Sequence, residues 1–254
     1  MTDDRDRFAD FADQFVGRDG FARLNETTES PATQLAIDEA LLLAAQPVLR
    51  FWEVAGPAVI LGRSSRHAEE VQWSAAHAGR VPVLRRCTGG ASVVALSGCY
   101  MYSVILPMDR FGHLRGVDSL HDFVMPRVRD AAARQHPDVR LDGLCDLVLG
   151  DRKVGGNALR ILRDSVLYHG TLLYDADLDR IAGLLDHAPR QPSYRAERSH
   201  RDFIGNLPLD PNRFADDLSE TFGVTHQVSV EPLRPTVQRL LSERYDRSSW
   251  HRRH

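Results

Sequence analysis

The chain has 254 residues, of which 43% are hydrophobic, and carries a formal net charge of -3. This composition is typical of a globular protein and lacks the basic footprint of a nucleic-acid-binding protein. No run of about 18 apolar residues occurs and the acidic start has no apolar signal core, so we expect neither a membrane span nor a secretory signal.

Short strands and helices alternate along the chain. The residue patterns predict strands over 21–24, 48–54, 58–61, 81–86, 93–96, 100–106, 145–149, 153–161, 165–174 and 224–230. They predict helices over 32–45, 68–78, 120–135, 177–185, 210–222 and 233–245. The segment 189–206 is polar and is expected to be irregular.

The order of these elements indicates the fold class. Strands and helices are interspersed and several strands form hairpins, so we expect an α+β fold with a mixed, largely antiparallel sheet and flanking helices. We expect an N-terminal preamble over 1–20, a single domain over 21–245 and a loose charged tail over 246–254.

Lys153 is the only lysine of the chain, and every other residue among the 32 Lys+Arg is arginine. An ammonium is a compact point charge, unlike the planar guanidinium. The small residues Gly156, Asn157 and Ala158 follow, and glycine lets a ligand approach the backbone closely. A lysine-poor composition would also explain a lone lysine on a solvated hairpin, but these neighbours favour a functional role.

A second small-residue loop, Arg85-Arg86-Cys87-Thr88-Gly89-Gly90-Ala91-Ser92, follows the strand over 81–86. Consecutive small residues expose backbone N–H groups that can hold a phosphate or a carboxylate. Arg85 or Arg86 would add a charge-assisted clamp. The loop is neither a P-loop nor a GxGxxG motif, and a tight turn with two solvated arginines explains it equally well.

His169 and Gly170 lie together in the strand over 165–174. The glycine permits close approach, so the histidine is a candidate to line a pocket, although a single histidine is more often structural. The 11 histidines and the three cysteines, Cys87, Cys99 and Cys145, show no metal-type spacing. We therefore expect no metal site, and a reducing cytoplasm as the location.

Together these stretches resemble the lipoate-protein ligase A family, which shares its catalytic domain with biotin protein ligases and octanoyltransferases. The resemblance consists of Arg85-Arg86 with Thr88-Gly89-Gly90, Lys153-Val154 with Gly156-Asn157-Ala158, and His169-Gly170-Thr171-Leu172-Leu173. Supporting pieces occur in the family's order at 37–41, 51–53, 61–63, 177–178 and 206–207. The resemblance covers about residues 21–210 and implies the fold of that catalytic domain over 21–245.

The resemblance implies an enzyme that attaches a lipoyl or octanoyl group to a lysine of an acceptor protein. The implied acceptors are the lipoyl domains of 2-oxoacid dehydrogenase complexes or the glycine-cleavage H protein. The implied donor is lipoate or an octanoyl group, with ATP and Mg in the ligase reaction. Lys153 would contact the acyl carbonyl and the phosphate. The other implied site residues are Arg85, Arg86, Thr88, Gly89, Gly90, Ala91, Ser92, Val93, Val94, Gly156, Asn157, Ala158, His169 and Gly170.

Two departures from the family pattern leave alternatives open. The family loop usually continues with a third glycine, a His-Asp pair and a Gly-Asn, whereas this chain reads Ala91-Ser92-Val93-Val94 and later Gly98-Cys99. Ligases of the family often carry a C-terminal accessory domain, for which we expect no room here. An ATP-independent transferase and a non-catalytic acyl or lipoyl-domain binder therefore stay open, and a ligase would need a separate accessory protein.

Cys145 is the candidate nucleophile of the transferase alternative. It lies eight residues before Lys153 in the same hairpin, at a position where the usual ligase pattern has asparagine. Octanoyltransferase relatives form a thioester, and a nearby ammonium would lower the pKa of the thiol. A two-residue turn at Gly150-Asp151 places Cys145 on the face opposite Lys153, whereas a three-residue turn places both on one face. The alternative is a small buried hydrophobe.

Overall fold

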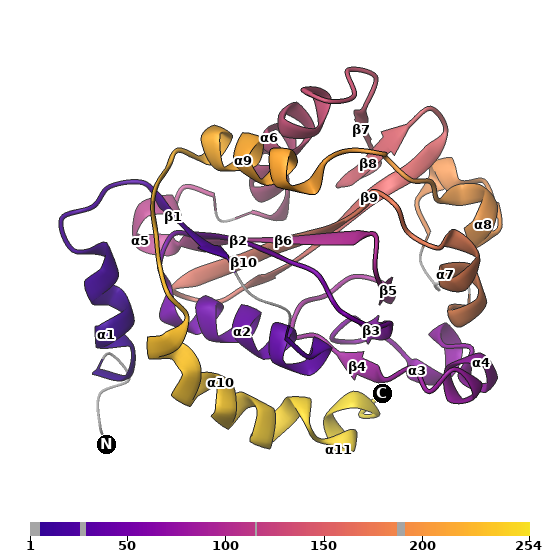
Figure 1. Ribbon diagram of the computed structural model, residues 1–254, viewed down its shortest axis with the longest axis horizontal. Coiled ribbons are helices and arrows are strands. Elements are labelled where there is room, and N and C mark those ends of the chain that lie inside the picture. The colour runs from indigo at the N-terminus through magenta and orange to yellow at the C-terminus, as the bar shows by residue number, and fades with distance from the viewer. Residues whose placement is uncertain (1–5, 26–28, 115, 187–190) are drawn as a thin grey trace.

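The computed structural model describes residues 6–25, 29–114, 116–186 and 191–254 (Figure 1). Residues 1–5 of the expected preamble and residues 189–190 of the expected irregular segment lie outside the described residues. Within the described part of the chain, no helix combines the length and the apolar character needed to cross a membrane.

An eight-stranded sheet forms the centre of the molecule, in the order β11-β1-β2-β6-β10-β9-β8-β7. Its strands are β1 (Phe21–Asn25), β2 (Val48–Trp52), β6 (Cys99–Pro107), β7 (Arg140–Asp142), β8 (Asp146–Leu149), β9 (Arg152–Ile161), β10 (Ser165–Leu173) and β11 (Val224–Gln227). Strand β1 pairs in parallel with β2 and β11, and the other neighbours pair antiparallel. The expected mixed, largely antiparallel sheet is therefore confirmed.

A second, three-stranded sheet has the order β4-β3-β5 and consists of β3 (Ala58–Leu61), β4 (Val83–Arg85) and β5 (Val93–Ala95). Although β3 follows β2 after only a short turn, the two strands belong to different sheets. Every residue of β3 is buried, so both faces of this strand are covered. The loop between β4 and β5 carries the small residues that the sequence singled out.

Helices cover both faces of the large sheet. Figure 1 shows α6 and α9 on one face and α2 and α10 on the other. The helices are α1 (Ala9–Ala12), α2 (Pro31–Ala44), α3 (His67–Glu70), α4 (Trp73–Ala78), α5 (Met108–Phe111), α6 (Val117–Ala133), α7 (Leu178–Leu184), α8 (His200–Phe203), α9 (Pro211–Phe222), α10 (Arg234–Leu240) and α11 (Ser248–His251).

Side-chain alternation in β6 divides the core into two clusters. Tyr102, Val104 and Leu106 join the cluster under α6 and α9, whereas Met101 and Ile105 join the cluster under α2. This alternation is the period of two that a strand buried on both faces requires. The α2 face also receives the three-stranded sheet, and this is the face on which the polar residues of the site gather.

The start of α2 follows its sequence signals. The Ser30 hydroxyl accepts a hydrogen bond from the Thr33 N–H, and Pro31 occupies the first turn. The helix expected over 68–78 is instead broken into α3 and α4, because Val71 leaves the helix and bridges to Leu185. The short strand β7 was not expected.

The expectation of a loose tail over 246–254 is not met. Helix α11 packs against β4, where the buried Arg85 guanidinium donates hydrogen bonds to the carbonyls of Trp250 and His251. The backbone N–H of Arg85 also donates a hydrogen bond to Nδ1 of the His251 ring. These hydrogen bonds hold α11 in place. They join residues far apart in the chain, so no local sequence pattern could predict them. The division into preamble and single domain stays a prediction.

Candidate functional site

A cavity of about 240 Å³ lies between the large sheet and the three-stranded sheet. Its wall is mostly apolar and includes Leu35, Trp52, Ile60, Val94, Met101, Leu173, Ile181, Leu185, Phe203 and Ile204. Its charged or polar groups come from Arg86, Ser92, Lys153, Asn157, His169, Thr171, Arg195 and His200. An apolar wall with a few polar groups suits a ligand that has an apolar chain and a polar head.

The cavity brings together the three stretches that the sequence singled out. The predicted residues in its wall are Arg86, Ala91, Ser92, Val93, Val94, Lys153, Gly156, Asn157, Ala158, His169 and Gly170. Thr88, Gly89 and Gly90 belong to the same loop but lie outside the described wall. Arg85 and Cys145 also lie outside it.

Lys153 lies across the backbone of its own strand. A Cβ added at Gly156 would lie 2.7 Å from both Cε and Nζ of Lys153, so only glycine at position 156 leaves room for the lysine. The ammonium is 2.7 Å from Asp146 Oδ1, and the Tyr194 hydroxyl donates to Asp146 Oδ2. Asp146 and Gly156 therefore fix the position of this point charge. Neither Asp146 nor Tyr194 was among the predicted site residues.

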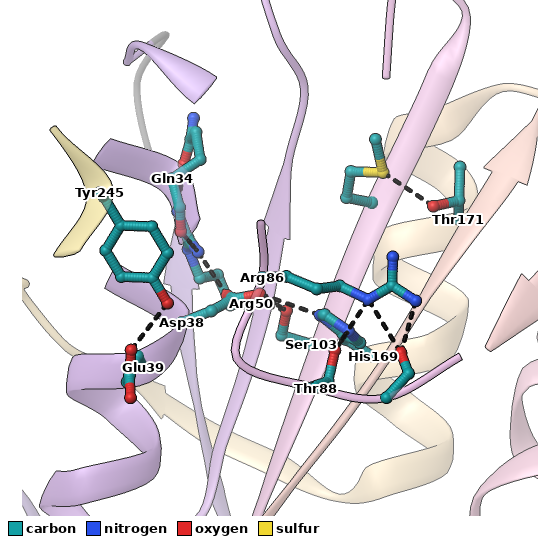
Figure 2. Close-up of polar contacts among 12 residues, drawn as sticks. Gln34, Asp38, Glu39, Arg50, Arg86, Thr88, Ser103, His169, Thr171 and Tyr245 are labelled. Carbon is teal, nitrogen blue, oxygen red and sulfur yellow. Dashed lines mark hydrogen bonds and ion pairs between the residues drawn. The ribbon is translucent and has the colours of Figure 1, made fainter. Parts of the chain in front are cut away.

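His169 stands in a chain of buried hydrogen bonds, shown in Figure 2. Its Nδ1 is 3.2 Å from Asp38 Oδ2, and its Nε2 is 2.7 Å from the Thr88 hydroxyl. That hydroxyl also accepts a hydrogen bond from Arg86 Nε, so its own proton is available to His169 Nε2. The network thus assigns the proton of a neutral His169 to Nδ1, where it is donated to Asp38.

Asp38 anchors this network from α2. Arg50 pairs with its carboxylate, and the Ser103 hydroxyl donates to both carboxylate oxygens at 2.9 Å (Figure 2). Burial raises the pKa of Asp38, but the Arg50 guanidinium and the contact with His169 together outweigh it and leave the pKa below its usual value. Burial also lowers the pKa of His169, although Asp38 opposes this. Asp38 is therefore ionised and His169 neutral near pH 7.

Sequence reasoning assigned no role to Asp38 or Arg50. A signal was present, because Arg50 is the only charged residue in the strand Val48-Leu49-Arg50-Phe51-Trp52, which is buried throughout. A buried guanidinium requires buried hydrogen-bond acceptors, of which an anion is the strongest. The sequence alone could not identify which carboxylate supplies it.

The loop between β4 and β5 is held from two sides. From inside, the buried Arg86 guanidinium donates hydrogen bonds to the carbonyls of Ile60, Gly89 and Ala91, and burial lowers its pKa to about 10. From outside, the Glu70 carboxylate accepts hydrogen bonds from the Ser92 N–H and hydroxyl. Arg86 therefore shapes the loop as well as lining the cavity.

Of the two arginines offered as a clamp, Arg86 lines the cavity and Arg85 does not. The buried guanidinium of Arg85 points away from the cavity and donates hydrogen bonds to the carbonyls of Gly62, Ser65 and His251. Neighbouring residues of a strand point to opposite faces, so only one of the two arginines can reach the cavity. Arg85 joins the turn after β3 to α11.

Gly170 on β10 makes room for a side-chain contact between β6 and β9, the strands on either side of β10. The Tyr102 hydroxyl donates to Asn157 Oδ1 directly over this glycine, where a Cβ would collide with both groups. Asn157 Nδ2 donates to the Cys145 carbonyl at 2.8 Å. On this side of the strand, the space over Gly170 is therefore filled by the side chains of Tyr102 and Asn157 and not left free for a ligand.

The surroundings of Cys145 do not favour a thiolate. Leu149 pairs with Arg152 and Val148 with Lys153, so the hairpin has the two-residue turn of the sequence analysis. Cys145 packs against the cluster under α6, and its thiol is 3.6 Å from the Asn157 carbonyl. Burial raises the pKa of the Cys145 thiol to about 11, and the nearby Lys153 charge does not offset this. The expected lowering of that pKa is wrong.

Comparison with known proteins agrees with this arrangement. Residues 30–222 match the model of the lipoyl protein ligase A/B catalytic domain. Lipoate–protein ligase 1 of Staphylococcus aureus is 26% identical over 241 residues, which cover 89% of this chain and 71% of that protein. The ligase LplJ of Bacillus subtilis is 26% identical over 201 residues, which cover 78% of this chain and 57% of that protein.

Solved structures share the fold. A lipoate-protein ligase A bound with ATP has a TM-score of 0.78 at 22% identity, and covers 91% of this chain and 98% of its own. A putative lipoate protein ligase of T. acidophilum with bound lipoic acid has a TM-score of 0.77 at 21% identity, and covers 92% and 99%. A bi-partite ligase studied with its E2 lipoyl domain from Thermoplasma acidophilum has a TM-score of 0.75 at 22% identity, and covers 92% and 97%.

The family model covers most of the chain, including the loop after β4, the lysine strand β9 and the histidine strand β10. These are the elements that surround the cavity. This chain therefore belongs to the lipoyl protein ligase A/B catalytic domain family.

Proposed function

We propose that this chain is an enzyme that attaches a lipoyl or octanoyl group to a lysine of an acceptor lipoyl domain. The observation that carries this proposal is the position of Lys153, whose ammonium is held beside an apolar cavity by Asp146 and Gly156. Membership of the lipoyl protein ligase A/B family supports it.

The reaction joins the acceptor amine to the acyl carbon. The amide bond forms, the donor's leaving group departs with its electron pair, and the amine loses a proton. Negative charge develops on the carbonyl oxygen, and a fixed ammonium such as Lys153 stabilises it best where water is excluded. The apolar wall would hold the acyl chain, at about 0.8 kcal/mol for each buried methylene.

Lipoate with ATP, which would arrive as its Mg complex, is the donor that we propose for the ligase reaction. Related structures with bound lipoic acid and with ATP support this choice. For the acceptor we propose a lipoyl domain of a 2-oxoacid dehydrogenase complex or the glycine-cleavage H protein, in line with the E2 lipoyl domain of the T. acidophilum system. A cytoplasmic location fits the three unpaired cysteines.

In the purified chain, we expect activation of free lipoate to be slower than acyl transfer. The loop after Gly90 lacks the third glycine and the His-Asp pair of the family pattern, and Glu70 holds Ser92 in their place. We therefore expect this chain to transfer a preformed acyl-adenylate faster than it activates free lipoate, with a separate accessory protein restoring activation. Pyrophosphate release and acceptor mass, followed in parallel, measure the two steps. Lipoate-dependent pyrophosphate release by the chain alone that matches the transfer rate would contradict this expectation.

Replacement of Cys145 by serine is expected to leave transfer within about threefold of the wild type. Its thiol is protonated at neutral pH, because burial raises its pKa to about 11, and a protonated thiol is a poor nucleophile. Acyl transfer by Cys145→Ser, followed by acceptor mass, checks this. A hydroxylamine-labile acyl group trapped on the Cys145 peptide, together with an inactive variant, would instead favour the thioester route.

The proposed function is tested by offering two donors to the purified chain with an apo lipoyl domain. One reaction contains lipoate with Mg-ATP, and the other contains octanoyl-carrier protein. Acyl addition to the acceptor in either reaction supports the proposal, and the donor that reacts identifies the route. Binding of the acceptor without modification by either donor, or by a preformed acyl-adenylate, would favour the non-catalytic binder.

A further inference from the structure

Arg195 is a buried cation at the cavity that no predicted role includes. It ends the short turn Ser193–Arg195, is 4% exposed and lines the cavity with Lys153. Its Nε donates to the Arg198 carbonyl at 3.0 Å, and its guanidinium lies 5.0 Å from the centre of the Phe203 ring. Its Nη2 is buried and has no hydrogen-bond partner among the described residues.

Within the part of the chain that the structure describes, Arg195 also has no counter-ion. Among the described residues no carboxylate lies within ion-pair distance of it, whereas Lys153 is paired with Asp146. Burial lowers the pKa of Arg195, and the nearby positive charge of Arg198 lowers it further. An arginine stays charged even so. The buried guanidinium of Arg86 donates to three carbonyls, whereas Nη2 of Arg195 has no acceptor among the described residues, and a buried donor without an acceptor is unfavourable. The arrangement is therefore incomplete until an anion enters the cavity.

Arg195 is linked to Lys153 through its neighbour in the chain, Tyr194. The Tyr194 hydroxyl donates to the same Asp146 carboxylate that holds the Lys153 ammonium. The segment after α8 is joined to β9 as well, because the Gly205 N–H donates to the Lys153 carbonyl at 2.9 Å. Two cations from distant parts of the chain thus belong to one connected group at the cavity.

We infer that Arg195 binds the anionic head of the acyl donor. A guanidinium offers two parallel N–H donors, and a carboxylate or a phosphate oxygen pair matches them. The apolar wall beside it, with Phe203 and Ile181, would receive the acyl chain. The anion is the carboxylate of the free acid or the phosphate of its adenylate. This inference rests on the proposed function for the identity of the occupant.

Binding measurements with three probes that share one acyl chain test the inference. Octanoate carries a carboxylate, an octanoyl sulfamoyl-adenosine carries an anionic mimic of the adenylate phosphate, and octanamide is neutral. The variant is Arg195→Gln, which removes the charge. The control is Arg201→Gln in α8, because Arg201 is 49% exposed and pairs with Asp179 at the surface.

We expect Arg195→Gln to weaken binding of an anionic probe by about ten- to a hundredfold and to leave octanamide binding within about twofold. Arg201→Gln should bind all three probes as the wild type does. Weakened octanoate binding identifies the carboxylate as the partner, and weakened binding of the adenylate mimic alone identifies the phosphate. Unchanged binding of both anionic probes would overturn the inference, as would an equal loss for octanamide, which indicates a purely structural role.

The melting temperature gives a second readout. Arg195→Gln removes the unpaired charge but also the hydrogen bond to the Arg198 carbonyl and the contact with Phe203, so the readout is the rise of the melting temperature on ligand addition. The variant should lose the stabilisation that octanoate or the adenylate mimic gives to the wild type. Equal stabilisation of the variant and the wild type by these ligands would contradict the inference. A wild-type chain that binds none of the probes would contradict the proposed function itself, and the inference with it.

Discussion

We expect Lys153→Arg to lower acyl transfer at least about a hundredfold, the loss typical of removing one oxyanion donor. The substitution keeps the positive charge but needs more space than the site offers. The lysine lies directly over Gly156 and ends 2.7 Å from Asp146 Oδ1. A planar guanidinium is larger than an ammonium and cannot occupy the same position. The rate of acceptor modification under single-turnover conditions measures the effect.

A matched control separates this effect from a general change of charge type. Arg163→Lys makes the reverse exchange in the turn between β9 and β10, where Arg163 is 95% exposed. This variant should transfer at the wild-type rate, and both variants should retain the wild-type melting temperature within a few degrees. Near-wild-type transfer by Lys153→Arg would remove the lysine from the mechanism.

Asp38→Asn is expected to lower the free energy of unfolding by about 3–5 kcal/mol. The variant leaves the buried Arg50 guanidinium without its anion and deprives His169 Nδ1 of its acceptor carboxylate. A loss of this size is a large part of the stability of an ordinary domain. Urea denaturation at pH 7 measures it.

Asp130→Asn is the matched control. Asp130 pairs with Arg129 on the surface, where the two side chains are 55% and 41% exposed, and exposed pairs contribute less than about 1 kcal/mol. If both substitutions have equally small effects, the buried pair does not anchor the site. A fall in transfer activity of Asp38→Asn beyond its loss of folded protein would indicate that His169 is also misplaced.

The same pair makes stability depend on pH. The pKa of Asp38 in the folded state lies below its usual value of 3.8, because Arg50 favours the carboxylate. The stabilising contribution is therefore complete above the usual value and is lost as the pH falls through the lowered one. The stability difference between the wild type and Asp38→Asn should shrink below about pH 4, and a difference that grows there would contradict this assignment.

Local patterns predicted most helices and strands, but not which sheet each strand joins. Strands β2 and β3 are both buried throughout, and such strands lack the alternation that identifies a partner face. The packed tail was missed for a related reason, since α11 is held by Arg85, a residue far away in the chain. Both outcomes depend on long-range contacts that no short window contains.

The residues of the site could be predicted only in part, because some of them act through contacts between distant parts of the chain. The small-residue stretches and Lys153 were visible, because glycines that permit close approach and a single lysine are features of the sequence itself. The partners of those residues were not, since Asp38 and Arg50 act through a pairing across the fold. Arg195 lay in a segment expected to be polar and irregular, and only its burial in the cavity marks it.

The mass of an apo lipoyl domain after incubation with the purified chain and a preformed lipoyl- or octanoyl-adenylate tests the central claim most directly. The account predicts that the wild type adds one acyl group to one lysine of the domain, located by peptide mapping, and that Lys153→Arg adds none in the same time. An acceptor that stays unmodified by the wild type, while a lipoate-protein ligase of known activity modifies it with the same reagents, would contradict the claim.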